Sequence, residues 1–126
     1  MIINDPTAMA QLTQAFAEYE QALVTNDIAT LDKLFWTSPH TLRYGVAENL
    51  YGFDAIQAFR NGRPALNLAR TVTRSALTTF GADYGVANIE FIRAGSDRVG
   101  RQSQSWVRFD EGWRVVAAHV SLMADK

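Results

Sequence analysis

The sequence predicts an α+β fold in which N-terminal helices pack on a strongly curved antiparallel β-sheet, forming a cone-shaped roll. Near the N-terminus apolar residues recur every three or four positions, as they do on one face of a helix. From Ala69 onward they alternate at every second position, as they do in strands. Short breaks that contain glycine separate the predicted strands, which favours an antiparallel meander.

Length and composition indicate one domain over residues 1–126, with a mass of 14.0 kDa. Hydrophobic residues make up 48% of the chain and charged residues 20%, and no apolar run reaches the roughly 20 residues of a membrane-spanning helix. The net charge of −1 argues against nucleic acid as a partner. No cysteine is present and the N-terminus lacks signal-peptide features, so we expect a cytoplasmic protein without a membrane partner.

Three helices are expected before the long strands. Asp5 is a suitable N-cap and Pro6 a suitable first residue for a helix that carries one apolar stripe. The stripe consists of Met9, Leu12, Phe16, Tyr19 and Leu23. Asp27 caps a second, short helix, and a third is expected over 54–61, ended by Gly62 with Pro64 beyond it.

The strands are expected to alternate their side chains between two faces. Two short strands are predicted over 40–45 and 49–51. Four long strands are predicted at about 69–80, 83–93, 98–109 and 113–123. Gly85 and Gly100 lie inside long strands, where glycine usually marks a bulge or bend, so we expect a sheet that curls over the helices.

Tyr19 and Arg43 are the first candidates for a ligand site. Tyr19 lies on the inward stripe of the first helix, where its hydroxyl needs a polar partner. It is either a core tyrosine bonded to a backbone carbonyl or a site residue. Arg43 lies in a short strand: facing inward it would clamp a carboxylate, and facing outward it would be solvated.

Other side chains could likewise either line a ligand site or have only a structural or surface role. Arg70 and Arg74 lie two strand periods apart and would add positive potential to an anion site, or lie on the surface. One strand face is predicted to carry Gln102, Gln104 and Trp106, and another Trp113, Val115, Ala117, His119 and Ser121. These faces mix apolar and hydrogen-bonding groups, as a ligand-binding wall does. His119 considered alone is more typical of a core histidine than of a catalytic one, because no acidic residue lies on its predicted strand face to orient it.

Several chemistries are excluded by residues that the sequence lacks. The only histidines are His40 and His119, so no metal site is predicted. A steroid-isomerase mechanism needs an aspartate base inside the cone, whereas Asp83, Asp97 and Asp110 fall in turns. No nucleophile elbow, phosphate loop or dinucleotide fingerprint occurs, and no cofactor is predicted.

Three stretches resemble one family in particular. They are YGVAENLYG at 44–52, GRQSQSWV at 100–107 and VAAHVSLM at 116–123. They are similar to the AtzH/HpxZ family, a SnoaL-like group of the nuclear transport factor two-like superfamily that is encoded beside amidases of cyanuric acid and oxalurate breakdown. The resemblance spans nearly the whole chain and implies a SnoaL-like or cystatin-like roll.

The resemblance also implies an activity, the cofactor-independent decarboxylation of an N-carboxylated urea such as 1,3-dicarboxyurea, towards urea and carbon dioxide. The family's tyrosine and arginine match Tyr19 and Arg43. Arg43 would clamp the carboxylate and Tyr19 would relay a proton to nitrogen. Four further residues are expected to bind the substrate, namely Asn49, Arg70, Gln104 and His119.

Two other classes of function compete with decarboxylation. A non-catalytic protein would use the cone to bind a small ligand or an amidase partner. A polyketide-cyclase-like enzyme would need a hydrophobic pocket and no Arg43. We also expect a homodimer or higher homo-oligomer, because Val99, Val107 and Phe109 alternate on the outer face of the sheet.

Overall fold

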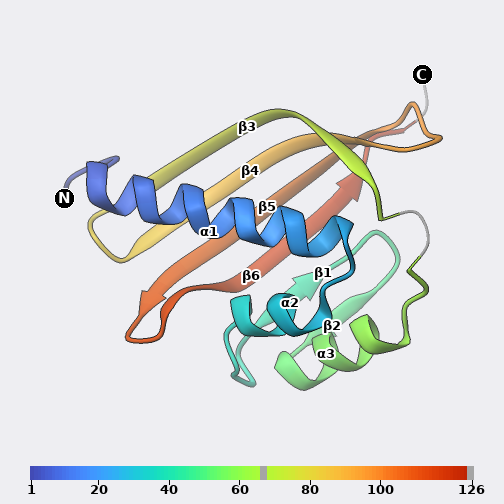
Figure 1. The fold of residues 1–126 in the computed structure, drawn as a ribbon, viewed down its shortest axis with the longest axis horizontal. Coiled ribbons are helices and arrows are strands. Elements are labelled where there is room, and N and C mark those ends of the chain that lie inside the picture. The colour runs from blue at the N-terminus through green and yellow to red at the C-terminus, as the bar shows by residue number, and fades with distance from the viewer. Residues whose placement is uncertain (66–67, 125–126) are drawn as a thin grey trace.

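A mixed six-stranded sheet wraps around the longest helix in the computed structural model, which describes residues 1–65 and 68–124 (Figure 1). The helices are α1 (Pro6–Val24), α2 (Ile28–Leu34) and α3 (Phe53–Gly62). The strands are β1 (Leu42–Tyr44), β2 (Asn49–Tyr51), β3 (Arg70–Phe80), β4 (Tyr84–Arg93), β5 (Val99–Phe109) and β6 (Gly112–Leu122). The predicted α+β class and the predicted elements are confirmed. No end of a long strand differs from its predicted position by more than one residue.

The first two helices begin at aspartate caps, as their sequences predict. The Asp5 carboxylate accepts a hydrogen bond from the Ala8 N–H at 3.0 Å, and Pro6 needs no partner because it has no N–H. The Asp27 carboxylate accepts from the Thr30 N–H at 3.2 Å. Only the Asp27 cap lies in the turn between α1 and α2, where the Asp27 N–H also donates to the Ala22 carbonyl at 2.8 Å.

The order of strands in the sheet is β2-β1-β6-β5-β4-β3. The long strands form an antiparallel meander, as predicted. The contact between β1 and β6 is parallel, with Leu42 opposite Ala117, so the prediction of an antiparallel sheet is wrong at this one contact. A pairing between strands some 70 residues apart leaves no local sequence signal, because no turn connects them.

α1 lies across the concave face of the long strands (Figure 1). Its N-terminal half packs on apolar side chains, and Leu12 and Trp106 are fully buried. Its C-terminal half carries Tyr19 and Glu20 toward the ends of β3 and β4, where arginines replace apolar residues. The fold therefore joins a dry apolar end to a charged end along one helix.

Gly85 and Gly100 allow close packing rather than mark bulges. Both pair regularly with their neighbours on the adjacent strand. A Cβ atom on Gly85 would lie 2.5 Å from Leu12 Cδ2, and one on Gly100 would lie 2.2 Å from Phe91 Cζ. Of the two expected features, a bulge or a bend, neither glycine marks a bulge, and the expected curvature of the sheet is present.

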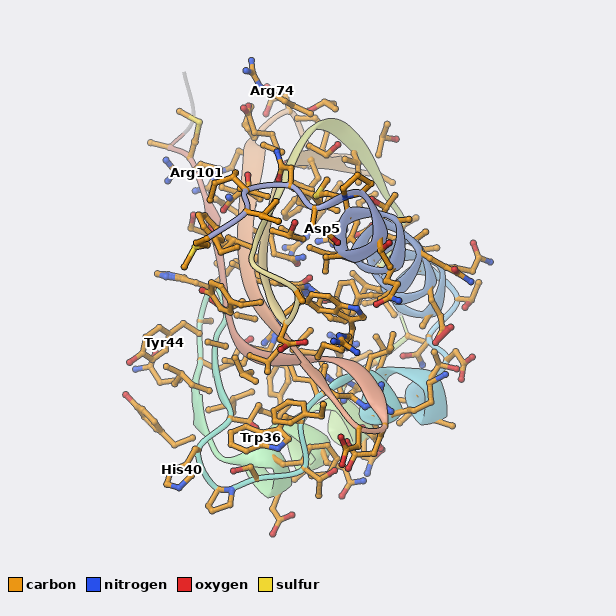
Figure 2. All side chains as sticks on the ribbon, turned by 90° about the vertical axis from the view of Figure 1, so that its left-hand side faces the viewer. Asp5, Trp36, His40, Tyr44, Arg74 and Arg101 are labelled. Carbon is orange, nitrogen blue, oxygen red and sulfur yellow. The ribbon has the colours of Figure 1, made fainter. Side chains whose placement is uncertain are left out.

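The register shifts lie elsewhere, at Thr73 in β3 and at Val116 in β6. An extra residue in a strand reverses which side chains face inward beyond it. Arg74 therefore points outward (Figure 2), whereas Arg70 points inward and contacts Glu20 of α1. In β6 the inward residues change from Trp113 and Val115 to those at even positions.

The outer face of the sheet is largely polar in its middle. Figure 2 shows Arg101 and Tyr44 on the side of the sheet away from α1. Val99, Val107 and Phe109 are partly buried within the chain, and Phe109 stacks on Trp36 at 5.2 Å between ring centroids. Oligomerisation through this face stays a prediction. In the described part of the chain, no helix is long and apolar enough to cross a membrane.

Substitution of Gly100 by alanine is expected to destabilise the fold by about 1–3 kcal/mol, because the added methyl group overlaps the Phe91 ring. Urea denaturation followed by circular dichroism measures this change. Gly62→Ala is the matched control, since a Cβ there meets no atom within 4 Å, and we expect it to be neutral or stabilising by up to about 1 kcal/mol. Equal stability of the two variants would contradict the packing argument.

Candidate active site

A small cavity of about 40 Å³ lies at the charged end of the sheet, beneath the C-terminal half of α1. We call it the arginine cavity. It is lined by Tyr19, Leu23, Arg43, Arg63, Leu68, Arg70, Arg93, Gln102 and Val120. An adjoining cavity of about 10 Å³ shares Tyr19, Leu23, Arg43 and Arg63 with it and is also lined by Arg60. The described lining holds positive charges and N–H donors without a carboxylate.

Tyr19 reaches the cavity from the inward stripe of α1 and is only 5% exposed. Its ring lies 6.3 Å from the rings of both Phe16 and Phe35, measured between centroids, so packing fixes its orientation. In the described residues the hydroxyl has no hydrogen-bond partner, and so the interpretation as a core tyrosine bonded to a backbone carbonyl is not supported. The hydroxyl is free to meet a ligand.

Arg43 faces the cavity rather than solvent, which decides between the two orientations that the sequence allows. Its Nη1 donates to Glu48 Oε1 at 2.9 Å, and its side chain is 15% exposed. The guanidinium lies 5.7 Å from the centre of the Phe59 ring. Gly45 makes this pairing possible, because a Cβ there would lie 1.8 Å from Glu48 Oε1. One carboxylate thus holds one edge of Arg43.

Arg70 is the most completely compensated cation of the cavity. Its Nη2 and Nε both donate to the Glu20 carboxylate, and Nη2 also donates to Gln102 Oε1 at 3.2 Å. The guanidinium lies over the Phe91 ring at 4.4 Å. These contacts tie α1 to β3 and β5, so Arg70 is part of the wall and faces inward as the sequence allowed.

Arg63 and Arg93 have no carboxylate partner in the described residues. Burial lowers the pKa of Arg63, and the positive charges of Arg43 and Arg60 lower it further. Burial also lowers the pKa of Arg93, with Arg70 and Arg43 as further causes. Such shifts arise where cations are crowded together away from water, which is the situation that a bound anion relieves.

Three buried donors at the cavity have no acceptor. They are Nε and Nη2 of Arg63 and Nε2 of Gln102. Buried polar groups in native proteins are nearly always hydrogen-bonded, so each of these three donors is open to an acceptor supplied by a ligand or by water. The arrangement is therefore suited to an acceptor-rich ligand such as a carboxylate.

Arg60 lies behind this site and supports it. It is 5% exposed, and its Nη1 donates to Asp32 Oδ1 at 2.6 Å. Burial lowers the pKa of Arg60, and the hydrogen bond to Asp32 raises it partway back. Its guanidinium lies over the Phe35 ring at 4.7 Å, which ties α3 to the end of α2.

The structure brings some predicted site residues together and leaves others outside. Tyr19, Arg43 and Arg70 all line the arginine cavity. Gln104 is buried deeper, where its Oε1 accepts from Trp106 Nε1 at 3.1 Å, and it is not part of the lining. Of the predicted substrate-binding residues, therefore, only Arg70 reaches this cavity.

Asn49 and His119 are exposed on the outside of the sheet. The His119 ring packs edge-on against Tyr44 at 5.5 Å between centroids. The predicted face that joined Trp113 to His119 is wrong, because the bulge at Val116 reverses the alternation. Ala118 and Val120 point inward instead.

Sequence reasoning missed Arg63 and Arg93, and named Gln102 only as part of a strand face. A signal for Arg93 exists, because Ala87, Ile89 and Phe91 alternate inward and the next residue in this series is Arg93. Arg63 lies just past the last residue of α3, where no periodicity predicts direction.

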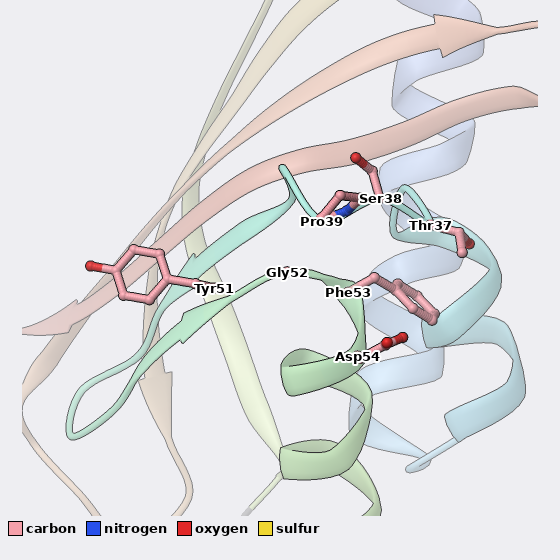
Figure 3. A pocket seen from close by; sticks show the side chains of 7 residues that line it. All are labelled: Thr37, Ser38, Pro39, Tyr51, Gly52, Phe53 and Asp54. Carbon is pink, nitrogen blue, oxygen red and sulfur yellow. The ribbon is translucent and has the colours of Figure 1, made fainter.

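A wider, open hollow of about 290 Å³ lies at the start of α3 (Figure 3). It is lined by Thr37, Ser38, Pro39, Tyr51, Gly52, Phe53 and Asp54. Asp54 is its one charged lining residue in the described part of the chain. Because it offers no cation, this hollow does not suit an anion.

The described lining of the arginine cavity contains no histidine, aspartate or glutamate that could bind a metal ion. Among residues 1–65 and 68–124, no group of three or more histidine, aspartate or glutamate side chains is placed to hold a metal ion. The groups that the cavity does offer are guanidinium donors, one carboxamide and one phenol. Guanidinium groups of this kind are suited to a carboxylate, and a phenol is able to donate a proton.

Comparison with solved structures places the fold. A protein of unknown function of the DUF3225 family from Pectobacterium atrosepticum is 52% identical, with 97% of this chain and 95% of that chain covered at a TM-score of 0.95. A cystatin-like fold protein from Burkholderia xenovorans LB400 is 44% identical, with 100% and 99% covered at 0.95. A nuclear transport factor 2-like superfamily protein from Salmonella enterica is 23% identical, with 96% and 94% covered at 0.77, and shows the fold alone.

None of the curated proteins compared matches this sequence. The AtzH-like family model, in contrast, matches residues 1–126. This match confirms the resemblance seen in the sequence motifs, and the fold agrees with the SnoaL-like superfamily. The chain belongs to the AtzH-like family.

Proposed function

We propose that this chain is a cofactor-independent decarboxylase of a small N-carboxylated urea of the 1,3-dicarboxyurea type. The observation that carries the proposal is the position of Tyr19 and Arg43 on one small cavity whose charged lining is entirely cationic in the described residues. The AtzH-like family and its association with cyanuric acid and oxalurate breakdown support this substrate class. A site for nonpolar polyketide-like substrates would be lined by apolar groups instead.

The reaction needs one bond cleavage and one proton. The C–N bond of the N-carboxylate breaks, carbon dioxide leaves, and the electron pair stays on the urea nitrogen, which takes up a proton. Negative charge therefore moves from the carboxylate onto the urea during the step. N–H donors placed around the urea stabilise that charge as it develops.

Arg43 and Tyr19 have different roles in this step. The free edge of Arg43 orients the reacting carboxylate while Glu48 holds the other edge. The Tyr19 hydroxyl, which no protein group in the described residues engages, donates a proton to the urea nitrogen and regains one from water. Arg70, held by Glu20, contributes charge to the wall without direct proton transfer.

Tyr19→Phe and Arg43→Gln are each expected to lower kcat/KM for decarboxylation by about 10²- to 10⁴-fold, because each removes one of the two groups that act on the reacting atoms. Carbon dioxide release from freshly prepared 1,3-dicarboxyurea, corrected for the spontaneous rate, measures the effect. Tyr44→Phe and Arg101→Gln are matched controls on the outer face (Figure 2). Near-wild-type turnover by either site variant, with a native circular dichroism spectrum, would reject the assignment.

Asn49→Ala and His119→Ala are expected to change kcat/KM by no more than about twofold, since both side chains lie outside the cavity. The same assay compares them with wild type. A loss as large as that of Tyr19→Phe would mean that the reacting site extends to the outer face, against the placement proposed.

Turnover separates the enzyme from a binding protein that uses the same cavity. An enzyme at low micromolar concentration is expected to release carbon dioxide from an excess of 1,3-dicarboxyurea at a rate proportional to enzyme concentration. A carrier would bind the same compound and leave the spontaneous rate unchanged or slow it. Binding by calorimetry without accelerated release would therefore favour the carrier.

A further inference from the structure

Gln102 presents a buried donor whose direction is fixed by its neighbours. The residue is 2% exposed, and its Oε1 accepts from Arg70 Nη2 at 3.2 Å. Arg70 can only donate, so the oxygen of the carboxamide must face it and the NH₂ group must face the other way. The Glu20 carboxylate holds Arg70 in place. Gln102 Nε2 is left without a partner at the cavity wall.

Arg63 brings two more unpaired donors to the same cavity. Its Nε and Nη2 are buried without acceptors, and these two atoms form one edge of the guanidinium. That edge matches the two oxygens of a carboxylate in a bidentate contact. Arg63 as a whole is only partly buried, but this edge has no acceptor in the described residues, and a bound carboxylate would supply one.

The charges around the cavity also point to more than one negative group. Arg43 and Arg70 are offset by Glu48 and Glu20. Arg63 and Arg93 have no such offset in the part of the chain that the structure describes. Within that part, the lining therefore keeps a surplus of two positive charges, which one monocarboxylate cannot neutralise.

We propose that Arg63 and Gln102 form a second carboxylate seat beside Arg43, so that the cavity selects small dicarboxylates over monocarboxylates. This inference rests on the proposed function and names the residues that recognise the second carboxylate. The reacting carboxylate lies at Arg43 and Tyr19, and the other carboxylate accepts from the Arg63 edge and from Gln102 Nε2. Arg93 contributes the remaining positive charge.

Isothermal titration calorimetry with glutarate and butyrate at low ionic strength tests the second seat. Glutarate has the same chain length between its carboxylates as 1,3-dicarboxyurea and no C–N bond to break, and butyrate lacks one carboxylate. Wild-type protein is expected to bind glutarate at least about tenfold more tightly than butyrate, because charge-assisted hydrogen bonds are the strong ones.

Two variants remove the seat in different ways. Arg63→Gln removes the charge and the paired edge. Gln102→Glu keeps an acceptor for Arg70 but places a carboxylate where the ligand's carboxylate would bind. Both are expected to abolish the preference for glutarate, and both are expected to keep or raise the Tm of the unliganded protein, since each relieves unpaired buried donors.

Arg101→Gln is the matched control, because it removes an exposed arginine from the outer face. It is expected to keep the wild-type preference and Tm. Lack of preference in wild type, or a preference that survives in both seat variants, would overturn the proposal. So would loss of glutarate binding together with a lowered Tm in both seat variants, since that pattern marks a structural role.

The two proposals fail separately. A preference for glutarate that depends on Arg63, in a protein that releases no carbon dioxide from 1,3-dicarboxyurea, supports the seat and rejects the decarboxylase. Accelerated release without any preference for glutarate supports the decarboxylase and rejects the seat.

Discussion

The contact on which the site depends is the ion pair between Glu20 and Arg70. It joins α1 to the start of β3, and through Gln102 it reaches the middle of β5. Buried cations are tolerated only when most of their charge is compensated, and this pair compensates the cation nearest the helix. Two further ion pairs compensate cations in the same way, one between Arg43 and Glu48 and one between Arg60 and Asp32. Each pair fixes the position of one arginine, and among the described lining residues only Arg63 and Arg93 are left without a carboxylate partner.

How much of the fold could be predicted depends on how local each signal is. Aspartate caps, apolar stripes and glycine-containing turns act within a few residues, and the elements that they specify were predicted within a few residues. The parallel pairing of β1 with β6 could not be predicted, because it depends on where two segments that are distant in sequence meet. The sequence indicates that Gly85 and Gly100 are special positions, but not why. Each allows close packing of a side chain, Leu12 at Gly85 and the Phe91 ring at Gly100, and that contact is visible only in the folded structure.

In the candidate site, too, residues with a local sequence signal could be predicted and the others could not. Tyr19 and Arg43 could be named because one lies on a regular apolar stripe and the other in a short predicted strand, and because the family resemblance matches both. His119 and Arg74 could not be placed, because a single extra residue at Val116 or Thr73 reverses the inward and outward faces without any glycine or proline to mark it. Arg63 follows the end of α3, where the chain has no period from which its direction could be read.

Charge balance also bears on release of product in the proposed reaction. A dicarboxylate neutralises the two surplus charges of the arginine cavity, and loss of carbon dioxide removes one negative group from the bound molecule. The product of this step is a urea with one carboxylate, which leaves one of the two surplus positive charges uncompensated. The product would therefore bind more weakly than the substrate. Unpaired donors at the empty site thus favour both entry of a doubly charged substrate and departure of a less charged product. The unpaired donors of Arg63 and Gln102 would therefore let one small cavity distinguish the doubly charged substrate from the singly charged product.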